Sequence, residues 1–254
     1  MKKVVIIGGG VAGLSAGIYS ALNGFDTEIL EMHSVAGGQC TAWDRKGFRF
    51  DYCLHWLVGT SKGAFHDIWR ETNVINDQTE IIDHDIHSKI IDRDGNEFFI
   101  YSNIDRWEQY LNRMAPEGKT TIVLRFESPW KLWENLEGED YKNEKKQIEK
   151  DAIVSLETIY SDISEHIEVT DVATPLTDVR YTGVKDGAYE GFMPAKENMM
   201  KTLDMQLPKL KNFYMAGQWL FPGGGLPPSA QTGKWTVQLI CKKEKKRFIS
   251  DKKL

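Results

Sequence analysis

Three glycines close to the beginning of the chain have the spacing with which a backbone can hold a pyrophosphate. Gly8, Gly10 and Gly13 fit the pattern G-x-G-x-x-G. In this pattern the first glycine permits a tight turn, the second lets the backbone approach the phosphates, and the third lets a helix pack closely on a strand. Glu31 follows at about the 20-residue spacing at which a carboxylate can accept hydrogen bonds from ribose hydroxyls. These residues predict a dinucleotide site, and a glycine-rich turn without a ligand is the alternative.

The surrounding sequence predicts the elements that would position these residues. Residues 2–7 form a short apolar run rich in β-branched side chains, residues 14–22 have helical spacing, and residues 27–31 form a second run that ends in the acid. The order predicts strand, helix and strand, and the helix would direct free N–H groups at the phosphates. The residues expected to hold this half of the ligand are Gly8, Gly10, Val11, Ala12, Gly13, Glu31 and Met32.

Further glycines indicate a ligand larger than NAD. Gly37 and Gly38, followed by Gln39, come soon after the ribose acid and suit a loop that folds back over the same pyrophosphate. Residues 212–216 predict a strand, residues 217–228 are too rich in Gly and Pro for the interior of an element, and a helix is expected from Ser229. A second strand, glycine loop and helix therefore close the chain. The ligand-binding residues expected in this loop are Gly217, Gln218, Pro222, Gly223, Gly224, Gly225, Leu226 and Pro227.

Four segments together resemble one family. They are VVIIGGGVAGLSAGIYSALNGFDTEILE at residues 4–31, GFRFDYCLHWLVG at 47–59, RYTGVKDGAYEGFMP at 180–194 and NFYMAGQWLFPGGGLPPSAQTGKWTVQLI at 212–240. They resemble the FAD-dependent phytoene desaturase and carotenoid isomerase-like oxidoreductases of the amine oxidase superfamily. The resemblance implies FAD as cofactor, with its ADP half on the first motif and its flavin ring near the last. It also places His55 and Trp56 near the flavin.

The chain departs from that family in length and at two site positions. Family members are about twice as long, and the resemblance breaks near residues 111–117, as if a large internal block of the substrate domain were missing. Gln39 stands where many relatives have Arg, and Gln218 where many have an acid. Either residue can still form hydrogen bonds, but neither brings a charge.

The predicted fold class is α/β. We expect a Rossmann-like FAD-binding domain formed from both chain ends, residues 1–80 and 195–254, with a reduced antiparallel-sheet α+β region between, residues 81–194. The Asp-Gly pair at positions 94 and 95 predicts a hairpin turn within residues 89–101. Strands are expected at 119–127 and 167–172, and a long amphipathic helix at 144–166, with residues 137–146 as a charged loop or helix start.

No catalytic residue is assigned from the sequence. His55 could relay a proton at the flavin, but a structural histidine packed under an aromatic ring is the favoured alternative. The three cysteines, Cys40, Cys53 and Cys241, form no C-x-x-C pair, so no metal site and no disulfide framework are expected. Such a cysteine content fits the cytoplasm.

Charge and hydropathy limit the partners. The formal net charge of −5 gives no electrostatic case for nucleic acid. No apolar run approaches the roughly 20 residues that span a bilayer, and the chain enters its first strand without room for a signal peptide. The basic run at 242–247 could touch an anionic membrane surface, but a solvated helix end is favoured. A missing block would leave apolar surface uncovered, so a homo-oligomer is expected.

Three functions remain open. The first is an FAD-dependent oxidoreductase with a hydrophobic, polyene-like or isoprenoid-like small-molecule substrate. The second is a minimised FAD-binding module without efficient catalysis. The third and weakest is an NAD-dependent dehydrogenase, for which one strand–helix–strand unit would suffice.

Overall fold

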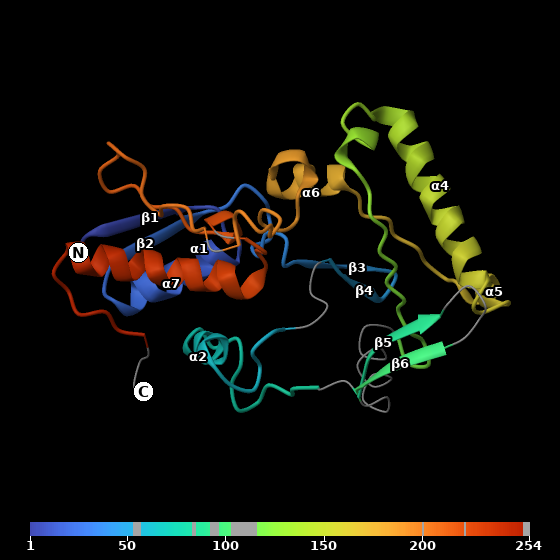
Figure 1. Ribbon diagram of the computed structural model, residues 1–254, viewed down its shortest axis with the longest axis horizontal. Helices are drawn as coiled ribbons and strands as arrows, with labels where there is room; N and C mark the ends of the chain where they lie inside the picture. The colour runs from blue at the N-terminus through green and yellow to red at the C-terminus, as the bar shows by residue number, and fades with distance from the viewer. Residues whose placement is uncertain are drawn as a thin grey trace.

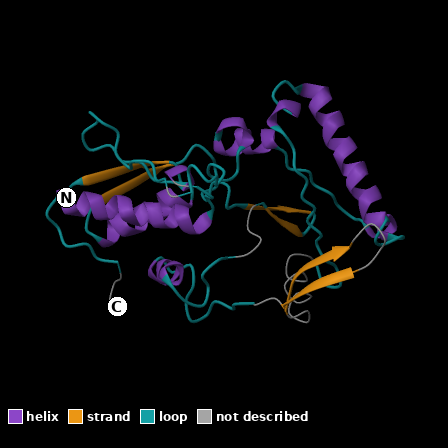
Figure 2. Cartoon of the chain, viewed as in Figure 1, coloured by secondary structure: helices purple, strands orange, loops and turns teal. Residues whose placement is uncertain are grey.

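The computed structural model is mixed α/β (Figures 1 and 2). It describes residues 1–52, 57–82, 85–91, 97–102, 116–199, 201–220 and 222–250.

The first unit is the predicted strand, helix and strand. β1 (Lys3–Ile7) leads into α1 (Val11–Leu22), which returns the chain to β2 (Asp26–Leu30). β1 and β2 pair in parallel, from Lys3 opposite Asp26 to Ile7 opposite Leu30. A parallel pair needs a crossover connection, which α1 supplies. The apolar side chains Val4 and Ile6 pack toward α1, against a core cluster that contains Tyr19.

The last helix packs along the first. α7 (Leu226–Lys243) lies beside α1 (Figure 1), so the two ends of the chain meet in one body. Gly233 makes this possible, because a Cβ there would lie 2.5 Å from the carbonyl oxygen of Ala12 and 2.8 Å from the nitrogen of Ala16. Val237 and Cys241 of α7 are buried against α1 in the same core cluster.

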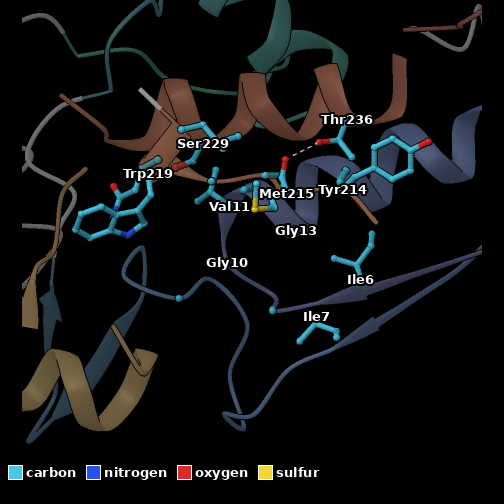
Figure 3. A pocket seen from close by; sticks show the side chains of 18 of the residues that line it. Ile6, Ile7, Gly10, Val11, Gly13, Tyr214, Met215, Trp219, Ser229 and Thr236 are labelled. Atoms are coloured by element: carbon cyan, nitrogen blue, oxygen red, sulfur yellow. Dashed lines mark hydrogen bonds between the residues drawn. The ribbon is translucent and has the colours of Figure 1, made fainter. Parts of the chain in front are cut away.

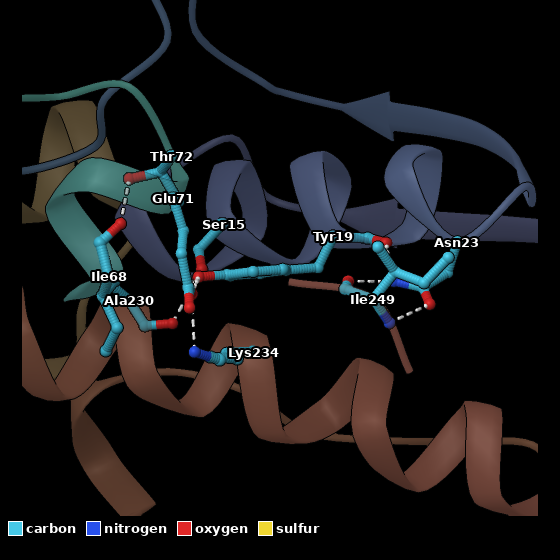
Figure 4. Close-up of polar contacts among 9 residues, drawn as sticks. All are labelled: Ser15, Tyr19, Asn23, Ile68, Glu71, Thr72, Ala230, Lys234 and Ile249. Carbon is cyan, nitrogen blue, oxygen red and sulfur yellow. Dashed lines mark hydrogen bonds and ion pairs between the residues drawn. The ribbon is translucent and has the colours of Figure 1, made fainter. Parts of the chain in front are cut away.

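A partly buried ionic contact fixes α2 (Ala64–Glu71) to both helices (Figure 4). The Glu71 carboxylate accepts a hydrogen bond from the Tyr19 hydroxyl and lies 2.5 Å from the Lys234 ammonium. Burial and this carboxylate raise the pKa of Tyr19 far above its usual value, so the phenol remains a donor. Ile68 and Trp69 of α2 pack in a second core cluster with Ala230 of α7.

The middle of the chain forms small sheets and separate helices. β3 (Ala42–Arg45) and β4 (Phe48–Asp51) pair antiparallel, as do β5 (Asp85–Ile91) and β6 (Glu97–Ser102). The second pair confirms the predicted hairpin, although its Asp-Gly turn lies outside the described residues. The remaining elements are α4 (Gly138–Glu157), α5 (Ile163–His166), α6 (Pro175–Thr182) and the short 3-10 helices η1 (Trp130–Leu132), η2 (Lys185–Gly187) and η3 (Gln218–Leu220).

Three predicted strands were wrong. Residues 119–127, 167–172 and 212–216 are irregular rather than strand. In the last segment the Met215 N–H donates to the carbonyl of Met205 at 2.7 Å. The Met215 carbonyl accepts from the Thr236 hydroxyl at 3.3 Å. These contacts engage backbone groups that a strand ladder would need.

Two helix boundaries also differ from the prediction. The helix expected at 144–166 begins earlier, at Gly138, and ends at Glu157, with α5 as a separate turn. α7 begins at Leu226 rather than Ser229. Pro227 and Pro228 fit its first turn because N–H groups there have no partner within the helix. Among the helices of the described residues, none is long and apolar enough to cross a membrane.

Two buried serines on α1 give a matched stability test. Ser15 Oγ donates to the carbonyl of Ala230 at 2.7 Å, whereas Ser20 Oγ has no hydrogen-bond partner among the described residues. Burying an unsatisfied hydroxyl opposes folding, so Ser20→Ala should raise the free energy of unfolding by about 1 kcal/mol. Ser15→Ala should lower it by about 1 kcal/mol.

Urea unfolding of both variants, followed by circular dichroism, measures the difference. Equal destabilisation by the two substitutions would show that Ser20 is satisfied in solution.

Candidate functional site

A cavity of about 1740 Å³ lies among β1, the glycine loops and α7 (Figure 3). It brings together predicted residues from both chain ends. The predicted residues that line it are Gly8, Gly10, Val11, Ala12, Gly13, Glu31, Met32, Gly37, Gly38, Gln39, Gly217, Gln218, Gly224, Gly225, Leu226 and Pro227. Pro222 and Gly223 are not in its lining; the Gly223 N–H instead donates to the carbonyl of Phe192 at 3.1 Å. His55 and Trp56 lie outside the described residues.

The first glycine loop leaves space that the protein does not fill. Gly13 is required by packing, because a Cβ there would lie 2.0 Å from the carbonyl oxygen of Gly8. Gly10 is different: its φ of −71° suits any residue, and a Cβ would meet nothing nearer than the Cα of Gly38 at 4.0 Å. The chain itself therefore does not need a glycine at position 10. A ligand that approaches the backbone there does need one.

The second glycine pair folds back onto the first loop. Gly37 donates its N–H to the carbonyl of Gly9 at 2.9 Å, and Gly10 and Gly37 form a parallel bridge. A Cβ at Gly38 would approach the Cα of Gly10 to 3.2 Å. The two loops thus present adjacent backbone at one side of the cavity.

The predicted ribose acid is held at the edge of this cradle. Glu31 accepts hydrogen bonds from the backbone N–H groups of His33, at 2.9 Å, and of Gly9, at 2.5 Å. These bonds hold the pKa of Glu31 below its usual range, with the bond from His33 as the larger cause. The carboxylate is therefore ionised at neutral pH and available as an acceptor.

The two residues that depart from the family resemblance are in direct contact. Gln218 Nε2 donates to Gln39 Oε1 at 2.9 Å and to the carbonyl of Tyr189 at 3.0 Å. Gln218 Oε1 accepts from the N–H of Gly225, at the beginning of α7, at 3.0 Å. A neutral amide pair thus joins the N-terminal and C-terminal glycine loops.

Asp178 completes this network and was missed in the sequence. Its side chain is 4% exposed, and its oxygens accept from Gln39 Nε2 at 3.3 Å and from the Tyr52 hydroxyl at 2.5 Å. Burial raises the pKa of Asp178, while the two hydrogen bonds act in the opposite direction. A sequence signal was present: Thr174 caps α6 and Pro175 occupies its first turn, which predicts a helix that carries Asp178.

The lining supports binding more clearly than acid–base chemistry. Burial raises the pKa of the Cys40 thiol, which disfavours the reactive thiolate. Among the described residues there is no group of three His, Cys, Asp or Glu side chains that could hold a metal ion. Backbone N–H groups, glycine loops and one ionised carboxylate suit an elongated ligand that carries phosphates and a ribose.

Comparison with known proteins agrees with this geometry. Residues 6–72 match the family described as NAD(P)-binding Rossmann-like domain. In these residues the chain is similar to the nucleotide-binding domain of FAD-dependent oxidoreductases. FAD is the cofactor that this match and the relatives together imply.

Several of the relatives are named as desaturases. The chain is 33% identical over 84 residues to a 1-hydroxycarotenoid 3,4-desaturase of Flavobacterium sp., which is 31% of this chain and 17% of the relative. It is 28% identical over 117 residues to a carotenoid 3,4-desaturase of Haloarcula japonica, 45% of this chain and 23% of the relative. It is 28% identical over 112 residues to a phytoene desaturase of Fusarium fujikuroi, 43% of this chain and 19% of the relative.

The chain thus spans about a fifth of the length of these relatives. Among solved structures it resembles a CLA-producing fatty acid isomerase from P. acnes, with 25% identity. That match covers 37% of this chain and 21% of the other, at a TM-score of 0.28 that is too low to support an argument.

The buried carboxyl of Asp178 gives a pH-dependent prediction. Its folded-state pKa is raised above the unfolded value of about 4, so its stabilising contribution is present below that pH and is lost as pH rises through the folded-state pKa. Asn can still accept from Gln39 and can donate to Tyr52, but it cannot ionise. The stability of Asp178→Asn relative to wild type should therefore rise as the pH is raised above about 4.

Urea unfolding of both proteins at each pH measures this difference. Burial also raises the pKa of Asp51, but Asp51 is present in both proteins, so its contribution to the pH dependence cancels in the comparison. A difference that does not change with pH would contradict a raised pKa at Asp178.

Proposed function

We propose that this chain is an FAD-binding flavoprotein of the desaturase-like oxidoreductases, with a hydrophobic small molecule as substrate. The observation that carries the proposal is the open space over Gly10, bounded by the Gly37–Gly38 loop. The glycine loop before α7 lines the same cavity. A single nucleotide loop would suffice for NAD, so the second loop favours the larger cofactor.

The chain's own residues have distinct parts in this proposal. The backbone at Gly10 and the first turn of α1 would hold the pyrophosphate, and Glu31 would accept hydrogen bonds from the ribose. Gly217, Gln218 and the loop before Leu226 would hold the flavin end. FAD supplies the redox chemistry when bound, and the protein orients it and excludes water.

The lining of the cavity supports a hydrophobic substrate. Its lining includes Phe65, Phe213, Met215 and Trp219.

A second candidate is an FAD-binding module without efficient turnover. The aligned segments are only about a fifth of the relatives' length. The outer face of the two-stranded sheet is also uncovered, with Val5, Ile7 and Leu30 exposed. Apolar surface of this kind favours self-association, and the homo-oligomer remains a prediction.

FAD binding is tested at Gly10. Gly10→Ala adds one methyl group without a clash in the protein, so the urea midpoint should stay near the wild-type value. The same methyl should obstruct the pyrophosphate and lower FAD affinity at least about tenfold, and Gly10→Val should lower it further.

Flavin absorption of the purified protein and titration with FAD measure the effect. Gly13→Ala is the contrasting variant, because its clash with Gly8 should impair folding as well as binding. Wild-type FAD affinity in Gly10→Val, or no FAD binding by wild type, would refute the proposed site.

Turnover separates the two candidates. We expect slow, incomplete flavin reduction when the FAD-loaded chain is mixed anaerobically with a lipophilic polyene. The reacting carbon must be held about 3–3.5 Å from the flavin in a lining that excludes water. The matched control omits the polyene. Fast and complete flavin reduction by the polyene would instead favour the competent oxidoreductase.

A further inference from the structure

We propose that Tyr181, whose ring lies against that of His33, forms the wall on which the adenine ring of the bound dinucleotide stacks. This inference rests on the proposed function and assigns a residue that lies far in sequence from the first glycine motif. The wall comes from the end of α6 and the turn that follows it, residues 181–184.

The contacts bring this segment to the ribose end of the site. The rings of Tyr181 and His33 are 5.2 Å apart between centroids, at 86° to one another. At Gly183, where φ is +67°, a Cβ would lie 3.8 Å from the Met32 sulfur. Tyr181, Thr182 and Val184 line the same cavity as Glu31 and Met32.

The surface that remains open is aromatic and apolar. Tyr181 is 43% exposed although the Arg180 guanidinium lies 5.4 Å from its ring centroid, and Met32 is 76% exposed. An aromatic face and a thioether are both favourable contacts for a flat, π-rich ring. Such exposure would be unfavourable in water alone, but it is what a stacking platform requires.

The position of Glu31 indicates that the purine, rather than the flavin, occupies the space beside Tyr181. Glu31 is expected to bind the ribose, and the purine is bonded directly to that ribose. The adenine must therefore lie within one sugar of Glu31, which is where Met32 and Tyr181 lie. The flavin end, at Gln218 and the loop before α7, is joined to the network of Asp178 and not to Tyr181.

Calorimetric titration with ADP and with FMN tests the assignment. ADP carries the adenine and FMN lacks it. Tyr181→Ala should weaken ADP binding about 5- to 150-fold, the range of one lost stacking contact, and leave FMN binding unchanged. Tyr181→Phe keeps the ring and should stay within about threefold of wild type.

Tyr160→Ala is the matched control, because Tyr160 is also exposed but does not line the cavity. Unchanged ADP affinity in Tyr181→Ala would overturn the inference while leaving the proposed function intact. Failure of wild type to bind ADP, FMN and FAD would refute the proposed function itself.

A second measurement needs no alanine variant. In the wild-type protein, nuclear Overhauser effects between the adenine protons of ADP and the Tyr181 ring are expected, with the ring assigned through Tyr181→Phe. Bound ADP without such effects would place the adenine elsewhere and overturn the inference.

Discussion

The close approach of α1 and α7 is the constraint on which the site depends. Each helix begins at a glycine loop, α1 after Gly10 and α7 after Gly225. Because Gly233 has no side chain, the backbones of the two helices come near enough to set both loops on one cavity. A side chain at position 233 would separate the helices and, with them, the two halves of the proposed cofactor site. The contact of Glu71 with Tyr19 and Lys234 then fixes a third helix to the pair.

The two loops are tied together by neutral hydrogen bonds. Gln218 uses both of its donors and its acceptor, on Gln39, Tyr189 and Gly225. An acid at position 218 could accept from Gly225 but could not donate to the Tyr189 carbonyl. Gln39 and Gln218, the two positions at which the resemblance implies an Arg and an acid, are in direct contact. Asp178 is the ionisable member of the described network, and the amide of Gln39 lies between it and Gln218.

The elements that depend on residues close together in the sequence could be predicted from it. The spacing of Gly8, Gly10 and Gly13 predicted the strand–helix–strand unit, and the Asp-Gly pair at positions 94 and 95 predicted the hairpin at β5 and β6. The β3–β4 hairpin was harder to see, because its two-residue turn is Lys46-Gly47, with φ of 51° and 84°. Tyr181 reaches the cavity, and Asp178 reaches Gln39, through the placement of α6, which depends on tertiary packing. Residues 212–216 have strand composition but bond to Met205 and Thr236, and composition cannot reveal such partners.

The open edge of the two-stranded sheet formed by β1 and β2 explains the extent of the cavity. In a parallel pair of strands, every second residue of one strand forms its backbone hydrogen bonds with the other strand. Here the Lys2 carbonyl and the Gly8 N–H both bond to β2. The backbone groups of Lys3, Val5 and Ile7 must therefore face away from β2. Within the described part of the chain, β1 pairs with β2 alone, and the cavity runs along its other edge to residues 213–216. A dinucleotide binds beyond the carboxyl ends of such strands. It would therefore fill the end of the cavity at the glycine loops and leave the stretch beside β1 as additional volume, which is why the cavity exceeds the size of an ordinary cofactor site.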